Sequence, residues 1–291
     1  MPRAAKPPPA TRTPVRRAGG RRPALVLALV IAAVASLAAC GDDHGASAGR
    51  FTPRHPDRLV VATANLPAPG FWDGPPAAPT GGFEHGLAHA LARRFGLRRV
   101  EVVEVPFASL LDGDLRGADL ALSQLTPTGT REERLDFSTP YLEAPPAVLG
   151  RPGTTARDLQ GLRRLRFVVV ERTTLAGVVE RRIRPLDPPL VVARRRAALD
   201  AITGGRADAM VLDLPVALGL AADAPGRYAV AARLRGGEGL AVALPDGSPG
   251  LAAVDSAVRA LLADGTIDDL ARDAFARAGD PDAIPLVRTR P

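Results

Sequence analysis

The apolar positions of the chain form short runs that alternate with segments of helical spacing. Residues 59–63, Leu-Val-Val-Ala-Thr, form a β-branched run typical of a buried strand. Between Leu87 and Phe95 the apolar positions share one helix face, which predicts an amphipathic helix that ends at Gly96. The same criteria predict further strands at 100–105, 119–123, 167–170, 208–212 and 240–244, and helices at 109–115, 251–263 and 267–278. This alternation predicts an α/β fold with mostly parallel sheets.

Two distant segments resemble each other. Residues 111–121 and 199–209 each carry Leu-Asp, a turn with glycine, an Ala-Asp pair and then an apolar run. Either this is a common helix–strand junction met twice, or the chain has two lobes of like architecture. We interpret the chain as two α/β lobes with two hinge crossings, near residues 143–150 and 231–239. The expected organisation is a first lobe of 57–146 with 237–280, a second lobe of 147–236 and a C-terminal tail of 281–291.

The N-terminal segment has the organisation of an export signal. Residues 1–22 are basic and proline-rich, and residues 24–39 are small and apolar but shorter than a membrane-spanning helix requires. The run ends in Leu-Ala-Ala-Cys-Gly, which resembles the lipobox of bacterial lipoproteins. That resemblance implies that signal peptide 1–39 is removed and Cys40 is lipidated, whereas a plain secreted protein or an uncleaved anchor are the alternatives. Residues 40–56 are expected to form a flexible tether.

The charge of the chain lies almost entirely in this leader. The formal charge is +7, from 38 Lys and Arg against 31 Asp and Glu. Seven basic and no acidic residues precede Cys40, so 31 of each sign remain from Cys40 onward. A formally neutral mature chain gives no basis for a nucleic-acid partner, and we expect none. Because Cys40 is the single cysteine, an internal disulfide is excluded.

Polar side chains follow the predicted strands, where α/β folds bind ligands. Gln124, Thr126 and Arg131 come after strand 119–123 and supply the donors that a carboxylate needs. Asp213 follows strand 208–212 and can take an ammonium group. An arginine and an aspartate on opposite lobes suit a zwitterion. Further polar residues follow strand 167–170: Arg172, Thr173 and Thr174.

These motifs resemble the type II periplasmic solute-binding proteins of ABC importers, polar amino-acid branch. The resemblance covers roughly residues 58–278. It rests on Gly-Phe-Glu-His-Gly-Leu-Ala at 82–88, and on Thr-x-Thr-x-x-Arg followed by Asp-Phe-Ser-Thr-Pro-Tyr within 126–141. It implies a two-lobed α/β fold that closes around a polar amino acid by hinge motion. It also implies a monomer without cofactor or metal that is not an enzyme and delivers its ligand to an ABC permease.

The resemblance assigns a role to each site residue. Arg131 is expected to clamp the ligand α-carboxylate, and Asp213 to hold the α-ammonium. Supporting polar contacts are implied for Thr126, Gln124 (through its backbone), Thr173 and Thr174, and aromatic walls for Phe107 and for Phe71 or Trp72.

Four positions depart from the family pattern. Gly86 replaces an aspartate on a helix away from the cleft, and Arg172 replaces the glycine of Gly-Thr-Thr. Ala64 stands where some members carry an aspartate, and Leu212 where some carry a polar residue. The two anchors are therefore kept while the side-chain pocket is atypical. An inward Arg172 favours an acidic or amide side chain, and an outward Arg172 beside Glu171 is a surface charge.

Two other functions compete with transport. One is a surface sensor or orphan receptor without an importer, and the other is a cyclohexadienyl-dehydratase-like enzyme, for which Glu171 is the candidate acid. All three functions require an exported protein. Lipidation of Cys40 would hold it at the outer face of the cytoplasmic membrane or in the periplasm. His85 and His89 have metal-ligand spacing but lack a third ligand, and the arginines at 194–196 indicate a charged helix start.

Overall fold

The structure, a computed structural model, describes residues 50–276 and 281–289. The predicted signal peptide, the lipidation at Cys40 and most of the tether lie outside these residues. Across the two described ranges, no helix is both long and apolar enough to cross a membrane.

The first sheet is built from five strands in the order β2-β1-β3-β12-β4. Strand β1 is parallel to β2 and to β3, whereas β12 is antiparallel to β3 and β4. After its first residue β1 is wholly buried, as its β-branched run predicts. The strands are β1 Arg58–Thr63, β2 Arg99–Glu104, β3 Leu120–Ala121, β4 Leu135–Phe137 and β12 Ala243–Pro245.

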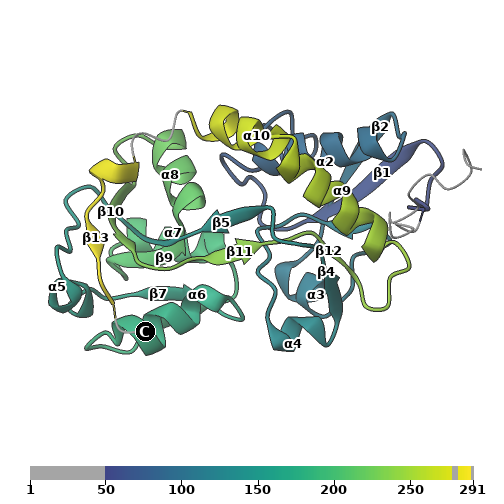
Figure 1. Ribbon diagram of the computed structural model, residues 1–291. Helices are drawn as coiled ribbons and strands as arrows, with labels where there is room; N and C mark the ends of the chain where they lie inside the picture. The colour runs from purple at the N-terminus through teal and green to yellow at the C-terminus, as the bar shows by residue number, and fades with distance from the viewer. Residues whose placement is uncertain (1–49, 277–280, 290–291) are drawn as a thin grey trace, which may run out of the picture. The chain divides into compact units, whose positions relative to one another are not determined.

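Three helices pack against one another beside this sheet: α2 Phe83–Arg94, α9 Leu251–Ala263 and α10 Thr266–Phe275 (Figure 1). Gly86 lies where α10 crosses α2, and a Cβ there would come within 2.5 Å of the Leu270 side chain. A larger residue would require the Leu270 side chain to move, which gives this departure from the family pattern a packing reason. Two short helices, α3 Phe107–Leu111 and α4 Gly129–Glu132, complete this part of the chain.

The second sheet has the order β13-β10-β6-β9. Its strands are β6 Pro146–Gly150, β9 Ala209–Asp213, β10 Ala229–Leu234 and β13 Leu286–Val287. Parallel strands β7 Val168–Val170 and β8 Leu190–Val192 lie next to it, since Phe167 bridges to Ala209. Its helices are α5 Leu159–Arg163, α6 Thr174–Gly177 with a π-helical continuation Val178–Ile183, α7 Arg195–Thr203, α8 Leu214–Asp223 and the 3-10 turn Pro281–Ala283. Part of the expected tail is thus a strand, β13, beside β10.

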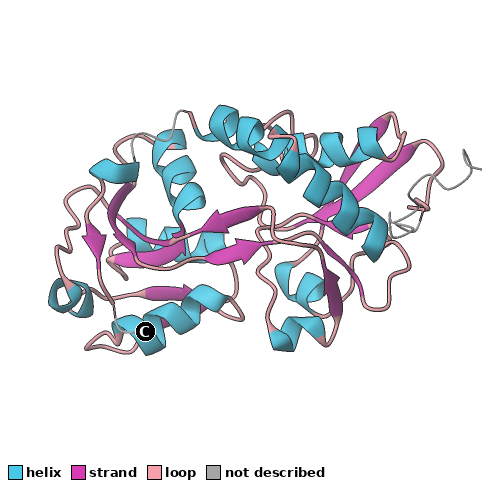
Figure 2. Ribbon diagram, in the orientation of Figure 1, coloured by secondary structure: helices cyan, strands magenta, loops and turns pink. Residues whose placement is uncertain are grey.

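Two antiparallel strands connect the sheets: β5 Leu142–Ala144 leads out and β11 Glu238–Leu240 returns (Figure 2). Because the chain leaves and returns through adjacent strands, β6 and β10 run antiparallel, and so do β12 and its neighbours. The expectation of mostly parallel sheets is therefore wrong, and both sheets are mixed.

The repeated Ala-Asp pair has the same local structure in both places. The Asp119 N–H donates to the Val60 carbonyl at 2.8 Å, and its carboxylate accepts the Val60 N–H at 2.8 Å. In the second sheet the Asp208 N–H donates to the Arg166 carbonyl at 2.8 Å, and its carboxylate accepts the Arg166 N–H at 3.0 Å. Each aspartate joins its own strand to the start of a neighbouring strand. This equivalence supports the interpretation of two lobes of like architecture.

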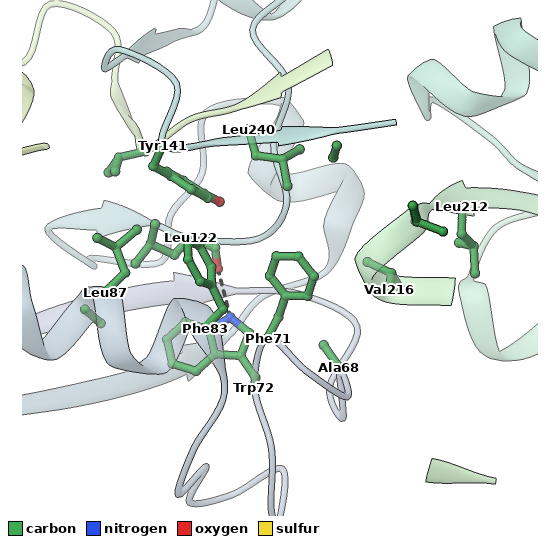
Figure 3. Packing of buried hydrophobic residues seen from close by; sticks show 14 of the residues in the cluster. Ala68, Phe71, Trp72, Phe83, Leu87, Leu122, Tyr141, Leu212, Val216 and Leu240 are labelled. Atoms are coloured by element: carbon green, nitrogen blue, oxygen red, sulfur yellow. Dashed lines mark hydrogen bonds between the residues drawn. The ribbon is translucent and has the colours of Figure 1, made fainter. Parts of the chain in front are cut away.

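Several aromatic residues gather in the core. Phe71 and Trp72 have no exposed surface and pack with Phe83 and Tyr141 (Figure 3). The Trp72 indole Nε1–H points toward the Leu122 carbonyl at 3.3 Å. The expectation that Phe71 or Trp72 forms a wall of the ligand site is corrected here, because both rings are enclosed by core residues.

Candidate functional site

Arg131 is a buried cation presented by α4. Its side chain is 7% exposed, and Nη1 donates to the Thr126 carbonyl at 2.8 Å. Nη2 reaches the Arg172 carbonyl of the second lobe at 3.4 Å. The Thr128 hydroxyl accepts the Arg131 N–H and caps the short helix, which fixes the direction of the side chain. Burial lowers the pKa of Arg131, while Glu238 and Asp213 act in the opposite direction.

Asp213 is the last residue of β9 and directly precedes α8, and its side chain makes no capping hydrogen bond to that helix. Burial raises its pKa to about 7, and Glu238 adds to this rise. Arg131 and Arg195 lower it, so both cations are close enough to interact with this carboxylate. The structure therefore brings together the two predicted anchors, a guanidinium from one lobe and a carboxylate from the other.

Glu84 lies behind these anchors as a fully buried carboxylate. Its two oxygens accept the Trp72 indole N–H at 2.7 Å and the Tyr141 hydroxyl at 2.5 Å. Gln124 donates to it twice, from its backbone N–H at 2.7 Å and from its amide Nε2 at 2.5 Å. Burial raises the pKa of Glu84, and these four donors oppose the rise. Since the backbone N–H and one Nε2 hydrogen of Gln124 point at Glu84, its oxygens and the second amide hydrogen remain for a ligand.

The remaining predicted residues surround the anchors at different distances. Thr126 is buried and contributes its carbonyl to Arg131. The Thr173 hydroxyl caps α6: it donates to the Val170 carbonyl at 2.7 Å and accepts the Ala176 N–H at 3.2 Å. Thr174, the first residue of α6, is half-buried. Phe107 lies under Arg131, with the guanidinium carbon 5.9 Å from the ring centre, a cation–π distance.

Arg172 takes the outward orientation, one of the two alternatives considered from the sequence, and is an exposed surface charge. Its guanidinium crosses to the first lobe, where it pairs with Asp112 at 2.6 Å and donates to the Ala108 carbonyl at 3.2 Å. The hydrogen bond lowers the pKa of the Asp112 carboxyl. The backbone of Arg172 is left-handed, with φ of 61°, which turns the side chain out of the site. Selection of the ligand side chain by an inward Arg172 is therefore not supported.

Arg172→Gly is expected to leave the order of ligand affinities unchanged. The replaced ion pair is exposed and screened by water, and glycine adopts the left-handed backbone without strain. Isothermal titration with a set of amino acids measures the order directly. A change in that order would show that Arg172 contacts the ligand after all.

A cavity of about 760 Å³ is lined from both lobes and includes Phe107, the residue that Arg131 contacts. Residues 65–67, 69 and 104–108 contribute to the lining from the first lobe, and residues 193–196 with Glu171 contribute from the second. Arg195, the first residue of α7, is 9% exposed and donates to the carbonyls of Asn65 at 2.5 Å and Pro67 at 3.1 Å. The charged helix start expected at residues 194–196 is the start of α7, and Arg195 within it is buried.

Two site residues escaped the sequence reasoning. Arg195 shares a helix face with Ala198 and Ile202, and that spacing was the available signal that it is buried. Glu238 lies on the returning strand β11 and acts on both anchors, but nothing in its sequence surroundings marks it. Across the residues that the structure describes, no three His, Cys, Asp or Glu side chains gather as a metal site. His85 and His89 contact each other, with ring centres 4.6 Å apart.

Comparison with known proteins identifies the family. Residues 59–277 match the bacterial extracellular solute-binding proteins, family 3. The chain belongs to this family. The predicted fold class, two α/β lobes of the type II periplasmic-binding-protein kind joined by two hinge crossings, is confirmed by that match and by solved structures. The residue boundaries proposed for the lobes stay a prediction.

Two curated relatives share part of their length with this family member. One is the membrane-bound lytic murein transglycosylase F of Ectopseudomonas mendocina (strain ymp), 36% identical over 143 residues, which are 46% of this chain and 28% of the relative. The other is the arginine-binding extracellular protein ArtP of Bacillus subtilis (strain 168), 34% identical over 83 residues, which are 28% of this chain and 32% of the relative. The matched segments thus span about a third or less of each relative.

Solved structures match over nearly their whole length. An ancestral arginine-binding protein bound to glutamine has a TM-score of 0.66 and 24% identity, over 76% of this chain and 99% of its own. An amino acid ABC transporter substrate-binding protein of Streptococcus pneumoniae bound to L-arginine has a TM-score of 0.64 and 27% identity, over 75% of this chain and 94% of its own. An ancestral amino acid-binding protein, a precursor of cyclohexadienyl dehydratase, has a TM-score of 0.62 and 27% identity, over 75% of this chain and 95% of its own.

Proposed function

We propose that this family member binds a polar amino acid, or a similar small zwitterion, between its lobes and delivers it to an ABC importer. Arg131 holds the α-carboxylate and Asp213 the α-ammonium. Thr126, Thr173 and Thr174 line the closed site, and no cofactor takes part. The protein acts as a monomer whose closed form the permease recognises.

One observation carries this proposal: two partly or fully buried groups of opposite charge face the same site from different lobes. Arg131 is desolvated and binds only carbonyl oxygens among the described residues. Burial disfavours the ionised form of Asp213 and raises its pKa to about 7, and an ammonium partner would lower that pKa. A zwitterion satisfies both groups at once, whereas a ligand with a single charge leaves one of them without a partner.

The site of action follows from the sequence of the leader. We propose that Cys40, the cysteine of the lipobox-like motif, carries the lipid that holds the protein at the outer face of the cytoplasmic membrane or in the periplasm. The tether of residues 40–56 then gives the lobes freedom to reach the permease. A surface sensor without an importer uses the same binding chemistry, so the two roles differ in the partner alone.

An enzyme of the cyclohexadienyl-dehydratase kind is the second candidate, because the ancestral precursor of that enzyme shares the fold. Glu171 lines the cavity but is exposed, and no described residue donates a hydrogen bond to its side chain. Nothing in the site holds that carboxyl in a position for proton transfer to a substrate. Turnover of prephenate or arogenate by the purified protein would favour this candidate over binding alone.

A binding screen of the purified mature chain, from Cys40 onward, tests the proposal. The standard amino acids are compared for the rise in melting temperature that they produce, and the positive compounds are titrated calorimetrically. We expect at least one polar amino acid to stabilise the protein, and the decarboxylated amine of that amino acid to have no effect. Stabilisation by the amine, or by no amino acid, would contradict the proposed function.

A further inference from the structure

Arg195 is a buried cation without an anionic partner. It is 9% exposed, and no Asp or Glu among the described residues forms an ion pair with it. Burial lowers its pKa to about 10, which reflects the loss of water around the charge. Glu84 and Asp213 act on it only from a distance. Glu84 already accepts four hydrogen bonds, and Asp213 is assigned to the ligand ammonium.

The guanidinium of Arg195 still has donors to offer. Its two hydrogen bonds, to the carbonyls of Asn65 and Pro67, both come from Nη2. Within residues 50–276 and 281–289, Nε and Nη1 donate no hydrogen bond, and Arg195 lines the 760 Å³ cavity. A guanidinium edge with two free donors matches the two oxygens of a carboxylate.

The cavity lies within reach of the amino-acid anchors. Phe107 belongs to its lining and also carries Arg131 on its face, with 5.9 Å between the guanidinium carbon and the ring centre. On the other side, Arg195 interacts electrostatically with Asp213. The space that Arg195 lines is therefore close enough to the anchors to receive the side chain of a ligand held by Arg131 and Asp213.

Other charges line the cavity, but they are exposed. Arg194 and Arg196 flank Arg195, and Glu104, Glu171 and Asp223 lie around them. Exposed charges are screened by water and are present in both signs. Arg195 is the one buried charge of this lining, so it has the largest influence on which side chain enters.

We propose, resting on the function proposed above, that the ligand is an acidic amino acid and that Arg195 binds its side-chain carboxylate. A cationic side chain would meet a buried positive charge, so the L-arginine bound by the Streptococcus pneumoniae protein is not expected here. A neutral amide of the same shape fills the space but leaves the cation unpaired. Arg195 thereby sets ligand specificity, while Arg131 and Asp213 set the general affinity for amino acids.

The test compares acids with their isosteric amides. L-Glutamate, L-aspartate, L-glutamine, L-asparagine and L-arginine are titrated into the mature protein by calorimetry at pH 7.5. We expect one of the acids to bind at least about tenfold more tightly than its amide, as for a buried charge that gains its partner. In Arg195→Gln the acid is expected to lose that advantage, and the amide to bind as tightly as the acid or more so.

Two neighbouring arginines provide matched controls. Arg194→Gln and Arg196→Gln remove the same charge from the same stretch of sequence, but both side chains are exposed. They are expected to keep the preference for the acid. Arg195→Lys, which keeps the charge with fewer donors, is expected to keep the preference with a weaker affinity, and it also serves if the glutamine variant does not fold.

Separate outcomes overturn the two proposals. If arginine or an amide binds the unmodified protein more tightly than both acids, the acidic ligand is wrong and amino-acid binding stands. If Arg195→Gln weakens the binding of acids and of amides by the same factor, Arg195 serves only to hydrogen-bond residues 65–67 to α7, and the specificity role is wrong. If none of the five amino acids binds, and the wider screen is also negative, the proposed function itself fails.

Discussion

Replacing Arg131 with alanine is expected to abolish amino-acid binding while the fold survives. The guanidinium is 7% exposed, so a ligand carboxylate that enters the site exchanges its water for this partner. Without Arg131 the carboxylate is buried unpaired, which costs about 2–5 kcal/mol, a loss of roughly thirtyfold to several thousandfold in affinity. Calorimetric titration of the variant with the tightest ligand measures the loss, and circular dichroism reports the fold.

Arg134→Ala is the matched control for this variant. Arg134 lies three residues further along but is exposed, and we expect its replacement to leave the affinity unchanged. The pKa of Asp213 is a second measurement, which distinguishes loss of the Arg131 contact from a change in the fold. Because Arg131 lowers the pKa of Asp213, its removal should raise that pKa above about 7. If Arg131→Ala binds amino acids as tightly as the unmodified protein, the carboxylate has been assigned to the wrong residue.

The sequence predicted the regular elements best where apolar spacing is continuous. Helix α9 spans 251–263 as predicted, because each turn of its pattern faces the core. Helix α2 begins four residues before its predicted start, since the left-handed Gly82, with φ of 98°, allows the chain to turn directly into Phe83. The predicted strand 240–244 is instead two strands, β11 and β12, that pair with different partners. Periodicity cannot report such a division, because it arises where the chain passes between sheets.

The site residues likewise divide into those marked by their local sequence and those that depend on how the lobes are arranged. Arg131 and Asp213 could be proposed because strand ends mark where ligands bind in α/β folds. Arg195 and Glu238 could not, since their importance depends on which lobe surface faces which. Arg172 illustrates the reverse error: it follows a strand end, yet its left-handed backbone turns the side chain toward Asp112. Position along the chain thus predicts candidates, whereas direction and burial decide among them.

Amino-acid affinity is expected to rise with pH up to about 7 and then to level off. Burial and the nearby Glu238 raise the pKa of Asp213 to about 7, while Arg131 and Arg195 limit the rise. Binding of an ammonium needs the ionised carboxylate, so below pH 7 the ligand must displace a proton. The affinity should therefore fall by up to about tenfold for each unit of pH below 7. Calorimetric titrations between pH 5.5 and 8.5 measure this slope, in a range where ligand carboxylates stay ionised.

Asp213→Asn should bind weakly and show no such slope, because asparagine neither ionises nor offers a full charge to the ammonium. The ligand-free variant should also differ in its stability. The raised pKa of Asp213 means that the folded protein keeps a proton between pH 3.8 and about 7 that the unfolded chain has lost. This group therefore stabilises the ligand-free fold most below pH 3.8, and its contribution disappears as the pH rises through 7. Urea unfolding across this range should show that decline in the unmodified protein and a smaller one in Asp213→Asn. Equal pH dependence in both proteins, in binding and in unfolding, would assign the titration to another group and remove Asp213 from the ammonium site.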